Sequence, residues 1–137
     1  LAAGRTAFWV GRLDVPHTLH YLPDVARSLV ILAGSDEAFG EVWHLPADEP
    51  LTGRQLIDLV AQGFGVRPRA RRLGSGMMRL AGVVQPQVRE ALELSYQFEA
   101  PFVADSSKFT AAFGRRITAH ADAVKATVAS YRANTGG

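Results

Sequence analysis

The sequence predicts a single α/β domain that spans residues 1–137. Short β-branched and aromatic runs alternate with helical patterns in the first half, whereas the second half is mostly helical in pattern. An apolar content of 47% and a charged content of 20% are ordinary for a globular protein with its own core. We expect sheet-edge strands and a buried helix in residues 1–50 and a mainly helical subdomain in residues 51–137.

The first half is predicted to hold three strands and one helix. Residues 6–10, 17–21 and 41–45 have the β-branched, aromatic or alternating pattern of short strands. A helix is predicted over residues 24–33, with Asp24 as its N-cap. This helix is apolar nearly all round, which is typical of a buried helix, so it needs cover on more than one side.

The second half begins with a capping box, in which Thr52 caps a helix and Gln55 reaches back from the third helical position. This helix is predicted to close near residues 63–65. An edge strand is expected over residues 68–73, where Pro stands at its start. Two apolar helices are expected next, over residues 75–84 and from Pro86 to about residue 98.

A brief strand over residues 101–104 and two helices complete the predicted order. Asp105 or Ser106 caps a two-turn helix that ends at Gly114, and Thr118 caps the last helix. That last helix carries an apolar stripe in a 3-4-3 spacing, made of Ala121, Val124, Val128 and Tyr131.

Composition excludes several classes of protein. There is no Cys, so neither disulfides nor Cys-ligated zinc are expected. No apolar run is long enough for a membrane span, no leader peptide is recognisable, and a net charge of +2 gives no general case for nucleic acid. We therefore expect a cytoplasmic protein with no membrane partner. Because the chain begins with Leu1 and enters an apolar segment at once, we expect it to be cut from a longer polypeptide.

Cofactor and catalytic motifs are missing from the sequence. Gly74 and Gly76 precede a helical pattern, but Arg79 stands where the dinucleotide fingerprint needs its third glycine. A catalytic Tyr-x-x-x-Lys is also absent, because the residues four positions after the three tyrosines are Val25, Ala100 and Thr135. We expect this chain to bind no cofactor and to supply no catalytic group.

Two polar clusters have an ordinary structural explanation. His17 and His20 are three residues apart, so on a strand they point to opposite faces, and no metal site is expected. The basic residues at 67, 69, 71 and 72 favour a solvated edge strand, since no aromatic residues interleave with them as nucleic-acid binding favours. Nucleic-acid binding through this cluster stays an alternative.

Four stretches carry a family resemblance. They are an Asp-Val-Ala helix entry in residues 20–26, a Gly-x-x-Trp strand in 40–46, a Thr-x-x-Gln helix start in 51–56, and an Asp-x-Ser-Lys ending from Asp105 that runs on through Thr118 to Tyr131. In this order they resemble the C-terminal part of the NAD(P)-dependent epimerase/dehydratase family, the extended short-chain dehydrogenases/reductases. The resemblance covers nearly the whole chain.

The resemblance implies the edge of a Rossmann-like body plus a small, mainly helical substrate-binding subdomain. It implies NAD or NADP for the full-length parent enzyme, and it places His17, Tyr96 and Phe98 at the pocket for a small-molecule substrate. Two arginines that contact the diphosphate in sugar-nucleotide epimerases have no counterpart in this sequence. The corresponding regions are residues 15–17 and 95–97, and neither contains an arginine. A smaller or less anionic carbonyl or alcohol substrate therefore fits better.

Two further expectations complete the sequence-based hypothesis. The alternative to a substrate-binding region is a standalone non-catalytic binding or interaction domain of the same fold. In the resembling family the outer faces of the helix at residues 24–33 pack on a sheet body that this chain lacks. Its large apolar side chains at positions 29–32 would otherwise meet water, so we expect a homo-oligomer.

Overall fold

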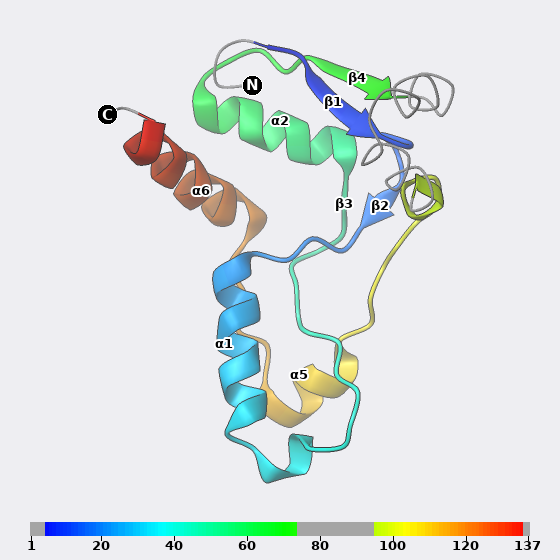
Figure 1. Ribbon diagram of the computed structural model, residues 1–137, viewed down its shortest axis with the longest axis vertical. Helices are drawn as coiled ribbons and strands as arrows, with labels where there is room; N and C mark the ends of the chain where they lie inside the picture. Colours follow the sequence, from blue (N-terminus) through cyan, green and yellow to red (C-terminus); the bar gives the residue numbers. More distant parts are fainter. Residues whose placement is uncertain (1–4, 74–94, 136–137) are drawn as a thin grey trace, which may run out of the picture.

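The computed structural model describes residues 5–73 and 95–135 and shows a mixed α/β chain (Figure 1). Its α-helices are α1 (Leu22–Ala33), α2 (Gly53–Phe64), α5 (Ser107–Phe113) and α6 (His120–Thr135), and two 3₁₀ turns are η1 (Asp36–Ala38) and η2 (Ser95–Phe98). The strands are β1 (Ala7–Val10), β2 (Pro16–His17), β3 (Leu51–Thr52) and β4 (Ala70–Leu73). The helices predicted over residues 75–84 and from Pro86 to residue 94, and the glycines at 74 and 76, lie outside the described residues.

The strands form two small sheets. β1 pairs with β4 in parallel, with Ala7 opposite Ala70. β2 pairs with β3 in antiparallel, and His17 also makes an isolated parallel bridge to Phe102. The strands predicted at 6–10 and 68–73 are thus confirmed apart from their ends. The strand predicted at 17–21 is limited to its first residue, and the one at 101–104 is limited to a single bridge.

Residues 41–45 do not form the predicted strand. The Trp43 ring packs against the rings of Phe109 and Phe113 on α5, with centroids 6.4 and 5.2 Å away. The carbonyl of Val42 accepts a hydrogen bond from the Lys108 ammonium at 3.2 Å. The alternating pattern therefore reflects packing on a helix, because no neighbouring strand of the described chain pairs with this segment.

Helix α1 begins earlier than predicted, and Asp24 is not its N-cap. Tyr21 takes the N-cap position, and Asp24 lies inside the first turn, where it is only 4% exposed. Asp24 and Ser28 are the buried residues of α1, whereas Leu29 and Val30 are exposed. In the described part of the chain, the apolar outer face of α1 is therefore left uncovered.

Helices α2 and α6 pack side by side in the upper half of Figure 1. The capping box at Thr52 and Gln55 is present as predicted, and Gly65 ends α2 in the left-handed conformation with φ 71°. Thr118, in contrast, does not cap α6. The backbone N–H of His120 donates instead to the Asp48 carboxylate at 2.9 Å, which holds the pKa of Asp48 below its usual value.

Helix α5 follows the prediction closely. Ser106 takes its N-cap position, while the Asp105 carboxylate accepts from the Ser107 N–H at 2.8 Å and Gly114 ends the helix. Phe109 of α5 is fully buried and packs on Phe113. The lower part of the molecule in Figure 1 is therefore organised around an aromatic cluster, whereas the upper part is organised around the α2–α6 contact.

Candidate functional site

His17 lies where two distant segments meet. It is only 6% exposed, and both of its ring nitrogens face backbone carbonyls. Nδ1 lies 3.1 Å from the Val15 oxygen, and Nε2 lies 3.0 Å from the Gln97 oxygen. Because carbonyls only accept, the doubly protonated ring satisfies both contacts at once, while a neutral ring satisfies one. In this arrangement the ring links β2 to η2, and both of its nitrogens are engaged by backbone carbonyls.

Phe98 is brought to His17 by a close backbone contact. The ring centroids of His17 and Phe98 are 5.8 Å apart, and the Arg12 N–H donates to the Phe98 carbonyl at 2.8 Å. Gly11, at φ 77°, lies against the same carbonyl so closely that a β-carbon there would overlap it. A glycine is therefore required at position 11 both by conformation and by space.

The three predicted site residues share one neighbourhood, but they are not equally available. Tyr96 is 67% exposed and Phe98 is 37% exposed, whereas His17 is buried. Tyr96 belongs to η2 with Phe98, and most of the helix predicted around residues 90–98 lies outside the described residues. The role of these three side chains in binding substrate stays a prediction.

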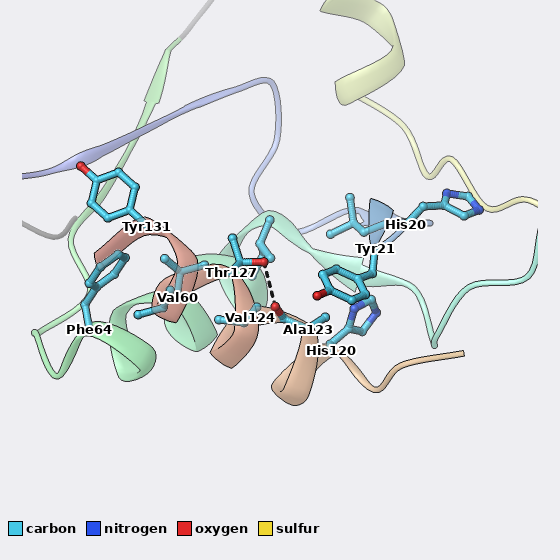
Figure 2. Close-up of a pocket in the computed structure, with 12 residues that line it drawn as sticks. His20, Tyr21, Val60, Phe64, His120, Ala123, Val124, Thr127 and Tyr131 are labelled. Carbon is cyan, nitrogen blue, oxygen red and sulfur yellow. Dashed lines mark hydrogen bonds between the residues drawn. The ribbon is translucent and has the colours of Figure 1, made fainter. Parts of the chain in front are cut away.

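A cavity of about 550 Å³ lies elsewhere, between α2, α6 and the segment that enters α1 (Figure 2). α2 contributes Leu56, Val60 and Phe64, and α6 contributes residues that include Val124 and Val128. Figure 2 shows Phe64 and Tyr131 at one end of the row of side chains and Tyr21 and His120 at the other. A site of this volume with a mostly apolar lining is typical of small-molecule binding.

Sequence reasoning missed this cavity, although the signal was available. Val124, Val128 and Tyr131, which belong to the predicted 3-4-3 stripe of the last helix, all line it. The apolar face that follows the capping box supplies the opposite wall. Two amphipathic helices predicted independently therefore indicated a shared apolar space, but their pairing could not be assigned without the structure.

Asp24 links the start of α1 to the segment before α6. Its carboxylate accepts from the Thr118 N–H at 2.7 Å, from the Thr118 hydroxyl at 2.9 Å and from Arg27 at 2.7 Å. Burial acts to raise the pKa of Asp24, but the Thr118 hydrogen bonds and Arg27 together lower it below its usual value. Asp24 is therefore held as a carboxylate by a structural role, with its oxygens occupied by the protein.

Lys108 makes a second link between distant segments. Its ammonium donates to the Glu41 carboxylate at 2.7 Å and lies 4.2 Å from the centroid of the Trp43 ring. The bond to Lys108 lowers the pKa of Glu41. Because both side chains of the ion pair are more than half exposed, its contribution to the free energy of unfolding is small.

The basic cluster includes one residue with a clear structural role. Arg72 on β4 donates to both carboxylate oxygens of Glu99, at 2.8 and 2.9 Å. Arg67, Arg69 and Arg71 are exposed. This ion pair ties the edge of the β1–β4 sheet to the chain just after η2.

Across residues 5–73 and 95–135, no group of three or more His, Cys, Asp or Glu side chains is placed to hold a metal ion. No helix among those residues is long and apolar enough to cross a bilayer.

Comparisons of the chain with models of protein families, with curated proteins and with solved structures found no match.

Proposed function

We propose that this chain is the C-terminal substrate-binding region of an NAD(P)-dependent epimerase/dehydratase-like oxidoreductase. It forms the edge of a Rossmann-like body together with a helical subdomain and supplies one wall of the pocket for a small carbonyl or alcohol. The cofactor loop and the catalytic tyrosine and lysine belong to the full-length parent, which uses NAD or NADP.

The observation that carries this proposal is the meeting of His17 with Phe98. The buried ring of His17, on β2, lies against the ring of Phe98 about eighty residues later in the chain, and its Nε2 contacts the neighbouring Gln97 carbonyl. A substrate wall built from two distant segments needs such a junction, because its shape depends on both being held rigidly.

The pairing of the family-like stretches with one another gives further support. Asp24, from the Asp-Val-Ala stretch, bonds Thr118 of the last stretch. Lys108, from the Asp-x-Ser-Lys stretch, bonds Glu41 of the Gly-x-x-Trp stretch. Residues that carry the resemblance thus hold the framework together, which is expected if they serve one common fold.

A standalone binding domain of the same fold is the second candidate. It is favoured by the apolar cavity between α2 and α6, because described residues of this chain line it. The gene separates the two candidates. An open reading frame that continues upstream of Leu1 into a glycine-rich strand–turn–helix supports the oxidoreductase, whereas a start codon directly before Leu1 favours the standalone domain.

Substrate binding is tested by titrating the chain with cyclohexanone and cyclohexanol while backbone amide shifts are followed by NMR. We expect saturable shifts at His17, Gln97 and Phe98, and we expect Phe98→Ala to weaken them. Phe39→Ala removes an exposed phenylalanine next to η1 and serves as the matched control. Shifts that avoid the His17–Phe98 junction, or that Phe98→Ala leaves unchanged, would contradict the proposed pocket.

A further inference from the structure

The geometry points to a second ligand site: we infer that the α2–α6 cavity binds a neutral, largely apolar alcohol or phenol. This inference goes beyond the proposed function, because none of His17, Tyr96 and Phe98 lines this cavity. Four features of the cavity lead to it: its size, the absence of Asp, Glu, Lys and Arg from its described lining, the aromatic rings at both ends, and the polar side chains of Tyr21 and His120 at one end.

The volume and the lining select a small apolar molecule. About 550 Å³ falls within the roughly 300–1,000 Å³ that is typical of small-molecule sites. Phe64 and Tyr131 meet edge to face at one end, with ring centroids 5.7 Å apart. Val60 and Val124 lie between the two ends (Figure 2). Such a lining favours a ligand that has a ring or a compact hydrocarbon group.

The described lining of the cavity disfavours an ionic ligand, and the guanidinium of Arg132 lies over the ring of Phe64 without itself lining the cavity. None of the described residues that line it is Asp, Glu, Lys or Arg. The N-terminal end of α6, which could attract an anion, is already occupied, because the His120 N–H donates to the Asp48 carboxylate. An anionic ligand would meet this carboxylate, and a cationic ligand would lose its water without gaining a partner.

The polar groups at the Tyr21 end favour a hydroxyl. Nε2 of His120 lies 2.8 Å from the Glu49 carbonyl, so Nε2 carries a hydrogen, and in the tautomer that carries only this hydrogen Nδ1 can accept. The Tyr21 hydroxyl, which Figure 2 shows directed toward the α6 residues, can donate and accept. A ligand hydroxyl can donate to the imidazole and accept from the phenol, whereas a ketone can only accept.

The inference is tested with three probes that share one ring system: 2-naphthol, naphthalene and 2-naphthoate. Each is titrated into the chain while amide shifts of α2 and α6 are followed by NMR. We expect saturable binding of 2-naphthol at about 1 mM or tighter, weaker binding of naphthalene and no binding of 2-naphthoate. Stronger binding of 2-naphthoate than of 2-naphthol would overturn the assignment to a neutral ligand.

Three variants locate the binding. Tyr21→Phe removes one hydroxyl, so we expect it to weaken 2-naphthol about fivefold and to leave naphthalene unchanged. Val124→Trp fills the cavity and is expected to abolish both, whereas Ala129→Trp adds the same indole to the exposed side of α6 and leaves both unchanged. If Val124→Trp does not fold, the affinities of Tyr21→Phe for 2-naphthol and naphthalene are sufficient to test the inference.

Two results would refute the inference. The first is binding of 2-naphthol with the same affinity to the Tyr21→Phe and parent chains. The second is a dimer, found by sedimentation at the titration concentrations, whose contact surface covers α2 and α6, because a second copy would then be the occupant of the cavity.

Discussion

The carboxylate of Asp24 is expected to contribute more to stability than any exposed ion pair of the described chain. Asp24→Asn keeps the size of the side chain but turns one oxygen into a donor. An amide nitrogen at the Oδ2 position faces the Thr118 N–H, and one at the Oδ1 position faces the Arg27 guanidinium, so in either orientation two donors oppose each other, at a cost of about 1–3 kcal/mol. The hydrogen bonds that remain lose their charge assistance, which adds about 1 kcal/mol. We therefore expect the free energy of unfolding to fall by about 2–4 kcal/mol.

Urea unfolding followed by circular dichroism at pH 7 measures this change. Asp58→Asn, which alters an exposed carboxylate on α2, is the matched control and should change the free energy of unfolding by less than about 0.5 kcal/mol. A loss for Asp24→Asn that is no larger than the loss for this control would refute the reasoning.

The pH dependence gives an independent check. The pKa of Asp24 is lower in the folded chain than its usual value of about 3.9 in an unfolded one. Its contribution to the free energy of unfolding is therefore fully present above pH 4–5 and is lost as the pH falls through the folded pKa. We expect the difference between parent and Asp24→Asn to shrink in acid, and a difference that stays constant down to pH 2 would contradict a buried carboxylate.

Three further predictions follow from the described contacts. Gly11→Ala should lower the free energy of unfolding by at least about 1 kcal/mol more than Gly40→Ala in urea titrations, because both glycines have positive φ but only Gly11 presses on Phe98; equal losses would rule out the Phe98 contact as the cause. Calorimetry should detect no sub-micromolar binding of NAD or NADP, because a pyrophosphate needs the glycine-rich turn that the sequence lacks; tight binding would contradict the proposed division of labour. The chain should self-associate at about 100 µM through the exposed face of α1, and Leu29→Glu with Val30→Glu should yield monomers in sedimentation; a parent chain that is monomeric at that concentration would show that this face needs no cover.

The sequence predicted correctly those helix ends that depend on residues close together in the chain. The capping box at Thr52 and the end of α2 near residue 65 depend on residues within one or two turns, and both are found as expected. The end of α5 at Gly114 is of the same kind. The α/β class followed from the same periodicities.

The predictions that were wrong concern residues whose structure depends on a contact with a distant part of the chain. Asp24 has the chemistry of an N-cap, but the backbone of Thr118 competes for its oxygens. Thr118 in turn leaves the capping of α6 to Asp48. Residues 41–45 alternate like a strand, yet Trp43 finds its partners on α5. No periodicity in the sequence encodes these pairings.

The bond between Asp24 and Thr118 also constrains the order in which the chain can fold. It joins residues 94 positions apart, so the two hydrogen bonds from Thr118 cannot form until residue 118 has been synthesised, and Arg27 is the partner within α1 before that. Closing a loop of that length is costly in chain entropy, and native contacts of large sequence separation slow folding. Docking of the segment before α6 is therefore a late event, and a chain that stops short of residue 118 leaves the Asp24 carboxylate without the two hydrogen bonds from Thr118.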